Sequence, residues 1–273
     1  MKKEDAFLKD YQLLSIPVMD EKGTPAWPEV FPPERIEEMK DRSGARHFAS
    51  QMMLDPMQTD RARLDTNAIR FYDHDLDIRA ARLGEIIING YAFYWDPSSA
   101  KQKSDGSVCV FVLSDGKNQR AFIHDCLYLE VKDGDPHPIA TQCTRVLNFM
   151  QGYGIKNIAI ETNGFGGALP EIMRRIAADG GQALNITGAA NRENKVMRIL
   201  NAIEPMLGAG RLYAHRRIKS TNLMDEMDDW TPNGHGRDDG LDALAGALRM
   251  PPVTLRPRGQ SIRPINAKTE FEV

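Results

Sequence analysis

The order of strand-like and helical segments after residue 84 constrains the fold more than any other feature of this sequence. Three β-rich strands come first: residues 85–89 and 91–95 make up the first, 108–113 the second and 121–131 the third. Short turns join them, which favours an antiparallel meander. Helical and strand patterns then alternate, over residues 136–152, 155–160, 164–179, 183–187, 191–207, 211–214, 221–230 and 238–250. This order predicts an α/β fold with a mixed sheet, in which the antiparallel meander is followed by parallel strands and helices flank the sheet.

The segments outside this region look less regular. Residues 1–31 are polar and proline-containing and predict an extended lead-in, followed by short helices at about 33–41 and 45–54. Residues 60–83 are rich in charge and favour a solvated loop, since the alternating Asp73, Asp75 and Asp77 lack the Gly and Glu of a calcium loop. We expect a lead-in over residues 1–60, the main domain over 61–250 and a flexible basic tail over 251–273.

Composition narrows the class of protein. The chain has 273 residues, of which 41% are hydrophobic and 27% charged, which suits one globular domain with an accessory segment. No apolar run is long enough to span a membrane, and nothing resembles a signal peptide. Cys109, Cys126 and Cys143 lack paired spacing and favour reduced thiols in a cytosolic protein. The net charge of -3 means that any nucleic-acid binding must depend on local patches.

Carboxylates crowd the start of the last helix, within residues 234–250. Asp238, Asp239 and Asp242 precede or enter an apolar pattern formed by Leu241, Leu244, Ala245 and Leu248. Helix capping and the helix dipole account for Asp238 or Asp239. They account less well for Asp242, which lies one turn further into the helix. Repulsion among these three carboxylates lowers the stability of the fold unless a cation lies nearby.

Two more acids follow apolar strand-like runs. Asp96 comes after the run 91–95 and before Pro97, and an ordinary Asp-Pro turn explains it equally well. Glu161 closes the run 155–160 and precedes a Gly-rich loop, at the position where α/β sheets place their active sites. These acids form an all-oxygen ligand set that suits Mg²⁺ or Mn²⁺, and two such ions can hydrolyse a phosphodiester. The Gly-rich loop lacks the Lys and Ser/Thr of a phosphate-binding loop, so the sequence does not favour an ATPase.

In this order, the strand-Asp, strand-Glu and helix-Asp pattern resembles the RNase H-like nucleases. Over roughly residues 30–250 the chain resembles, more narrowly, the C-terminal nuclease domain of phage terminase large subunits. The matching pieces are residues 48–56, Asp96-Pro97 with Asp105, residues 158–164, residues 195–199, residues 210–212 and residues 235–244.

The resemblance implies a metal-dependent endonuclease that cuts concatemeric double-stranded DNA during packaging. It implies that Asp96, Glu161 and Asp239 bind two Mg²⁺ or Mn²⁺ ions, with Asp238 or Asp242 assisting. The related junction resolvases also carry two acids three residues apart in their last helix, and Asp239 and Asp242 have this spacing. The implied partners are a packaging ATPase domain or subunit, a small terminase subunit and a portal, in the cytoplasm of an infected bacterium. Because the chain has no room for the ATPase, we expect an isolated nuclease domain or one gene of a split terminase.

Other functions remain open on sequence alone. A Holliday-junction resolvase or an RNase H-type nuclease would share the acids, and a non-catalytic domain that docks DNA or a motor would not need them. DNA contacts are expected from Arg192, Lys195 and Arg198, which share a helix face, and from Arg216 and Arg217 near the last strand. Lys195 is favoured by the resemblance and because a cation near a metal-bound phosphate helps to position it. The role of His235 stays undecided.

Overall fold

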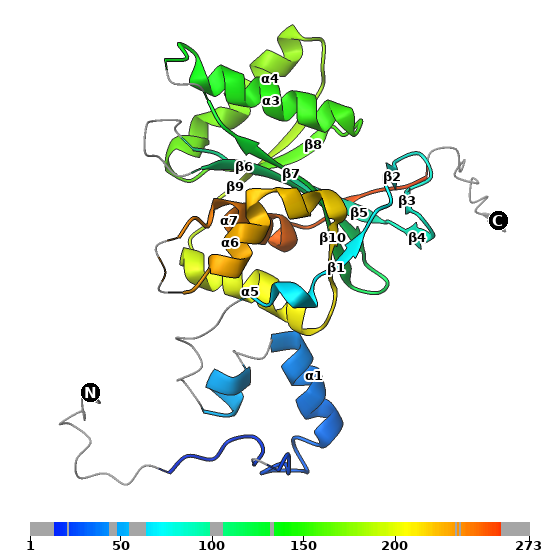
Figure 1. The fold of residues 1–273 in the computed structure, drawn as a ribbon, viewed down its shortest axis with the longest axis vertical. Helices are drawn as coiled ribbons and strands as arrows, with labels where there is room; N and C mark the ends of the chain where they lie inside the picture. Colours follow the sequence, from blue (N-terminus) through cyan, green and yellow to red (C-terminus); the bar gives the residue numbers. More distant parts are fainter. Residues whose placement is uncertain are drawn as a thin grey trace, which may run out of the picture.

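The computed structural model describes residues 14–20, 22–43, 48–54, 64–98, 106–131, 134–232, 234 and 236–257. Its main sheet has the strand order β1-β10-β7-β6-β5-β8-β9, with β11 also paired to β5 (Figure 1). The strands of this sheet are β1 (Arg70–Tyr72), β5 (Gly90–Asp96), β6 (Ser107–Asp115), β7 (Arg120–Leu129), β8 (Asn157–Glu161), β9 (Asn185–Ala189), β10 (Leu212–His215) and β11 (Val253–Thr254).

The sheet is mixed in the way that the sequence predicts. Strands β5, β6 and β7 form an antiparallel meander. Strand β8 then pairs with β5 in parallel, β9 pairs with β8 in parallel, and β10 and β1 continue the parallel pairing beyond β7. The expected α/β fold class, with an antiparallel meander followed by parallel strands, is therefore confirmed. Because β5 and β8 are adjacent and parallel, their carboxyl ends meet at one edge of the sheet.

Helices cover both faces of the sheet (Figure 1). On one face, α3 (Pro138–Gly152) and α4 (Leu169–Asp179) bury residues of one core cluster. On the other, α5 (Lys195–Gly208), α6 (Asn222–Asp229) and α7 (Asp239–Arg249) bury a second cluster. An outlying helix, α1 (Pro33–Ser43), contacts α5. The predicted helices after residue 136 are thus all present, and α5 continues through Pro205.

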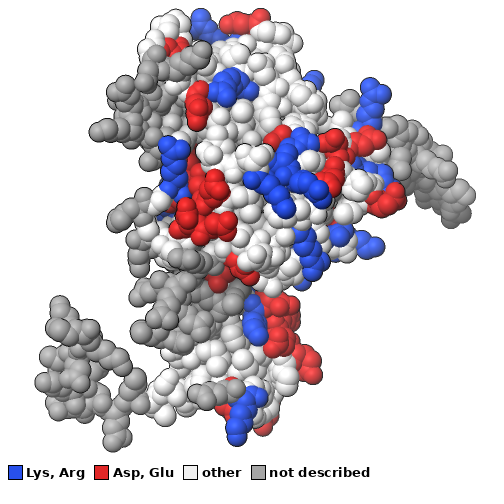
Figure 2. All heavy atoms as spheres, viewed as in Figure 1, with Lys and Arg blue, Asp and Glu red and all other residues white. Residues whose placement is uncertain are grey.

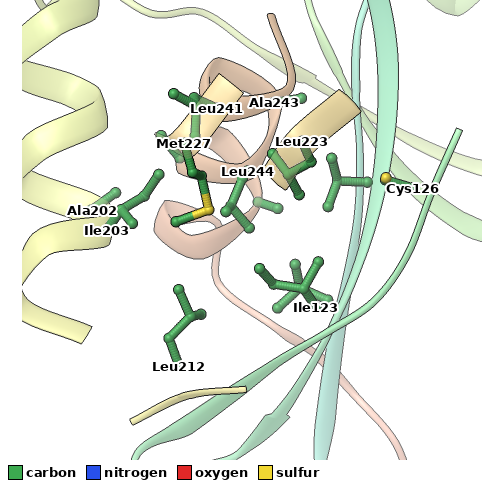
Figure 3. Close-up of a cluster of buried hydrophobic side chains, with 14 of the residues drawn as sticks. Ile123, Cys126, Ala202, Ile203, Leu212, Leu223, Met227, Leu241, Ala243 and Leu244 are labelled. Atoms are coloured by element: carbon green, nitrogen blue, oxygen red, sulfur yellow. The ribbon is translucent and has the colours of Figure 1, made fainter. Parts of the chain in front are cut away.

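Helix α7 is the most enclosed helix of the second face. Leu244 lies between Ile203 of α5 and Ile123 of the sheet, and Leu241 lies near Met227 of α6 (Figure 3). Gly246 allows the helix to lie directly on β5, because a Cβ there would come within 2.3 Å of the Tyr94 ring. Small residues in α7 therefore set the close approach of this helix to the strand.

Strand alternation decides which face each β5 side chain occupies. Successive side chains of a strand point to opposite faces. Tyr94 belongs to the cluster beneath α7, whereas Phe93 and Trp95 belong to the cluster beneath α3 and α4. Asp96 therefore shares the α7 face with Tyr94. In β8, Ala159 lies on the α7 face, which places Glu161 there as well.

The solvated loop expected over residues 60–83 is wrong in its described part. This region contains the 3-10 helix η4 (Thr66–Ala68), β1, and strands β2 (Leu76–Asp77) and β3 (Arg82–Leu83), which form a small sheet with β4 (Ile86–Ile87). These strands are only two or three residues long, so their pairing depends on tertiary contacts that no local pattern encodes. Charged residues of this region also form ion pairs, such as Arg216 Nε with Asp73 Oδ1 at 2.7 Å.

Two further expectations need correction. The tail predicted from residue 251 begins instead with β11, which pairs Val253 with Tyr91; residues 258–273 lie outside the described part. The helix expected at 45–54 is a five-residue π-helix, η2 (Phe48–Met52), and residues 45–47 are not described. In the described part of the chain no helix is long and apolar enough to cross a membrane. Cys109, Cys126 and Cys143 are buried and free.

Candidate active site

The first turn of α7 is capped by a distant residue. Asp238 occupies the N-cap position, yet its side chain makes no capping hydrogen bond. Glu226 of α6 accepts hydrogen bonds from the backbone N–H groups of Gly240 (2.7 Å) and Leu241 (3.3 Å) instead. A Cβ at Gly240 would lie 2.0 Å from the Tyr128 hydroxyl and 2.8 Å from Glu226 Oε2, so glycine at this position leaves room for both side chains. The capping interpretation of Asp238 is therefore wrong, because Glu226 satisfies the donors that Asp238 was expected to bind.

The side chain of Asp238 faces Lys195, at the start of α5. The Lys195 ammonium lies 2.7 Å from Asp238 Oδ1, 3.6 Å from Asp242 Oδ2 and 4.0 Å from Asp239 Oδ1. Burial alone lowers the pKa of Lys195, but the hydrogen bond with Asp238 and the neighbouring carboxylates outweigh it, so the net pKa is raised. Lys195 is thus a permanent cation among the acids of the α7 turn.

Asp242 forms a buried ion pair with Arg198, one turn further along α5. Arg198 donates from Nε to Oδ1 at 2.7 Å and from Nη2 to Oδ2 at 2.5 Å, which is a bidentate arrangement. Arg198 is 5% exposed and Asp242 is 4% exposed. Arg198 was predicted to contact DNA, but its guanidinium is buried in this pair and is not exposed to bind a phosphate.

Glu161 ends β8 with both carboxylate oxygens hydrogen-bonded. Tyr94 and Asn191 donate to Oε2 at 3.0 and 2.9 Å, and Asn163 donates to Oε1 at 3.1 Å. The Gly-rich loop behind Glu161 curls back onto it, because a Cβ at Gly166 would lie 2.0 Å from the Glu161 carbonyl oxygen. The close contact between this loop and the Glu161 backbone therefore requires glycine at position 166.

Asp96 and Asp239 complete the set of acids. Burial raises the pKa of Asp96 to about 8, and the charges of Glu161, Asp242 and Asp239 act in the same direction, while Lys195 opposes them. Carboxylates from β5, β8 and α7 are therefore close enough to repel one another. Asp239 is 8% exposed and its Oδ2 accepts a hydrogen bond from the backbone N–H of Gly106 at 2.8 Å, which ties α7 to the start of β6.

The chemistry of this donor set fits a hard divalent cation. All its members are carboxylates. Burial raises the pKa of Asp96, the charges of Glu161, Asp242 and Asp239 raise it further, and a bound cation would oppose these effects. Within the described residues, however, no three Asp, Glu, His or Cys side chains already surround one point as a metal shell would. Lys195 and Arg198 lie among the acids and pair with them.

The other expected DNA-binding residues lie in two regions: Arg192 directly follows Asn191, which binds Glu161, whereas Arg216 and Arg217 lie beyond β10. Arg192 is exposed in the loop before α5. Arg216 and Arg217 follow β10, which is separated from β5 by β7 and β6. Arg216 is exposed and paired with Asp73, and Arg217 donates to Tyr153 at 3.0 Å and to Asp125 at 3.4 Å. On the face drawn in Figure 2, clusters of positive and negative side chains lie next to each other among the described residues. His235 and Asp105 lie outside the described residues.

The sequence prediction missed the neutral partners of Glu161 and the cap of α7. Tyr94 could have been found, because it precedes Asp96 by two residues and so shares its face of the strand. Asn163 and Asn191 follow the ends of two adjacent parallel strands. Because the carboxyl ends of parallel strands lie at the same edge of a sheet, both residues could have been placed near Glu161. Nothing local in the sequence marks Glu226, which acts on a helix that starts 13 residues later.

Comparison with known proteins gives likenesses in structure. No protein-family model and no curated protein matches the sequence. Similar solved structures include the nuclease domain of the P22 large terminase (12% identity, 68% of this chain and 91% of that chain, TM-score 0.47). They also include the large terminase nuclease domain of bacteriophage SPP1 with bound Mn (13% identity, 68% and 97%, TM-score 0.41). A third is Thermus thermophilus RuvC in complex with a Holliday junction substrate (14% identity, 58% and 90%, TM-score 0.36).

Proposed function

We propose that this protein is a metal-dependent DNA endonuclease that hydrolyses phosphodiester bonds. The observation that carries the proposal is the convergence of carboxylates from the end of β5, the end of β8 and the first turn of α7, next to the cations Lys195 and Arg198. Burial, together with the charges of Glu161, Asp242 and Asp239, raises the pKa of Asp96 to about 8, and ionisable groups with strongly shifted pKa values are typical of functional sites. On the same proposal, a lead-in precedes a nuclease domain that begins at residue 61 and, because β11 pairs with β5, extends past the predicted end at residue 250.

Each side chain of the candidate active site has a proposed role. Asp96, Glu161 and Asp239 would hold two Mg²⁺ or Mn²⁺ ions, and Asp238 and Asp242 would assist from the same helix turn. Bound ions of this kind activate a water and stabilise the leaving oxygen of a phosphodiester. Arg198 fixes the orientation of Asp242, and Glu226 fixes the start of α7. Lys195, whose side chain is 35% exposed, offers a cation to a phosphate, and Arg192, Arg216 and Arg217 are further candidates for DNA contact.

The terminase type is supported by the six sequence motifs that occur in order along the chain. On this proposal the substrate is concatemeric double-stranded DNA, and the protein works in the cytoplasm of an infected bacterium. Its partners would be a packaging ATPase domain or subunit, a small terminase subunit and a portal.

Plasmid cleavage tests the proposal directly. We expect supercoiled DNA to be nicked and linearised with Mn²⁺ or Mg²⁺ and to stay intact in EDTA. Asp96→Asn, Glu161→Gln and Asp239→Asn should each lower the cleavage rate by about a hundredfold or more. Glu171→Gln is the matched control, because Glu171 is an exposed acid on α4 that pairs with Arg174. Full activity of a correctly folded Glu161→Gln variant would contradict the assignment.

The choice of substrate separates the related functions. Comparing duplex DNA, a four-way junction and an RNA–DNA hybrid distinguishes a terminase-type nuclease from a junction resolvase or an RNase H-type enzyme. Binding of duplex DNA without metal-dependent cleavage would indicate a docking domain instead.

A further inference from the structure

Neutral donors from three separate segments surround the carboxylate of Glu161. Tyr94 belongs to β5, Asn163 follows β8 and Asn191 follows β9. Asn191 Nδ2 donates both to Glu161 Oε2 at 2.9 Å and to the Tyr94 hydroxyl at 3.0 Å, and Tyr94 donates to the same Oε2 at 3.0 Å. The nearest cation, Arg198 Nη2, lies 3.9 Å from Oε1. Glu161 is thus oriented mainly by uncharged groups.

The two asparagines also lock their loops together. Asn163 donates from Nδ2 to the Asn191 carbonyl oxygen at 2.7 Å, and its Oδ1 accepts from the Asn191 backbone N–H at 3.1 Å. Alongside them, the backbone N–H of Thr162 donates to the carbonyl of Ala189 at 2.9 Å. The loop that leads to Lys195 is therefore fixed against the loop that follows Glu161. The side-chain amide of Asn191 takes no part in this backbone lock and is left to bind Glu161 and Tyr94.

Tyr94 connects the same carboxylate to α7. Its side chain is 1% exposed, and its ring lies against Gly246, where a Cβ would come within 2.3 Å. Its hydroxyl consequently has a position defined by the helix that carries Asp239 and Asp242. A shift of α7 relative to β8 would change the hydrogen bond between Tyr94 and Glu161.

We propose that Tyr94 and Asn191 are positioning residues that hold Glu161 in the orientation needed to bind a divalent cation. The inference rests on the proposed function. Hydrogen-bonded partners of ligating carboxylates set ligand orientation, and their loss typically lowers metal affinity or activity by about 10-fold to 100-fold. A purely structural role would affect folding stability but would leave the cation requirement of cleavage unchanged.

Two variants remove the donors with little other change. Tyr94→Phe keeps the ring against Gly246 and deletes only the hydroxyl. Asn191→Ala deletes the side-chain amide but keeps the backbone groups that bind Asn163. Tyr91→Phe is the matched control, because Tyr91 lies in the same strand and its hydroxyl donates to Asn157, at the other end of β8.

The test measures Mn²⁺ binding by electron paramagnetic resonance of the free ion, together with plasmid cleavage across a Mn²⁺ titration. We expect Tyr94→Phe and Asn191→Ala to raise the Mn²⁺ midpoint by about tenfold or more, and saturating Mn²⁺ to restore cleavage to within about threefold of the unmodified protein. Tyr91→Phe should behave like the unmodified protein. Unchanged midpoints in both folded variants would overturn the inference and leave the proposed function standing.

Failure of the proposed function gives a different result. If the unmodified protein neither binds Mn²⁺ nor cuts DNA, both proposals are overturned. If Tyr94→Phe fails to fold by circular dichroism, Asn191→Ala decides alone, since Asn191 is only half-buried.

Discussion

Replacing Arg198 by Met isolates the energetic contribution of the buried ion pair beneath the acids. Arg198→Met keeps most of the side-chain volume but leaves Asp242 without its bidentate partner. Breaking a buried pair from one side costs about 3–5 kcal/mol, because an uncompensated charge remains buried. The Lys195 ammonium stays 3.6 Å from Asp242, so we expect the lower part of this range, about 3 kcal/mol.

The matched control is Arg249→Met. Arg249 of α7 pairs with Glu193, just before α5, so both arginines join the same two regions of the chain. Side chains of this second pair are 46% and 33% exposed, and such surface pairs contribute about 0–1 kcal/mol. Urea unfolding followed by circular dichroism gives both free energies of unfolding from the transition midpoints and slopes.

A second substitution tests the reason for the loss. Burial already raises the pKa of Asp242, and the hydrogen bond from Arg198 opposes that rise. Asp242→Asn in the Arg198→Met background removes the unpaired charge, so it should recover about 1–2 kcal/mol. The reasoning is refuted if Arg198→Met destabilises no more than Arg249→Met, or if Asp242→Asn makes the Arg198→Met protein less stable.

Three further predictions concern the surroundings of the site and the core. Gly166→Ala should lower the free energy of unfolding by about 1–3 kcal/mol and reduce cleavage, because the added Cβ would lie 2.0 Å from the Glu161 carbonyl oxygen. The control is Gly167→Ala, whose added Cβ would have its nearest contact at 3.6 Å. Both variants are measured by urea unfolding and plasmid cleavage. Burial lowers the pKa of His124 to about 3, so the unfolded chain takes up a proton first on acidification. The free energy of unfolding should therefore fall as the pH drops below about 6.5 toward 3, and urea titrations of His124→Phe should show a shallower fall. Glu226→Ala should lower the melting temperature and slow cleavage, because α7 loses its cap. Glu226→Gln keeps an acceptor oxygen and should lose less in melting temperature and in cleavage rate. Equal losses in the two variants would argue against capping by Glu226.

Regular elements longer than about four residues were predictable because their patterns are local. The apolar run that ends in Glu161 and the meander before it place the strands correctly, and the helices after residue 136 follow from their periodicity. The short strands β1, β2 and β3 were not predictable. Their two or three residues carry too little pattern, and their pairing partners come from elsewhere in the chain.

The order of acids along the chain also indicates the site, because strand ends and helix starts are local signals. Alternation along β5 and β8 directs Asp96 and Glu161 to one face, and parallel pairing brings them to one edge. The sequence therefore determines that carboxylates from two strands and one helix can meet.

Only the tertiary structure decided which partner each acid takes. Asp242 pairs with Arg198, which lies 44 residues earlier in the chain. Asp238 forms an ion pair with Lys195, and Glu226 caps the helix that Asp238 was expected to cap. The physical reason is that backbone donors and buried charges are satisfied by whichever group the fold brings within reach. Local preference shows where a partner is needed, and packing of α5 and α6 against α7 determines which residue supplies it.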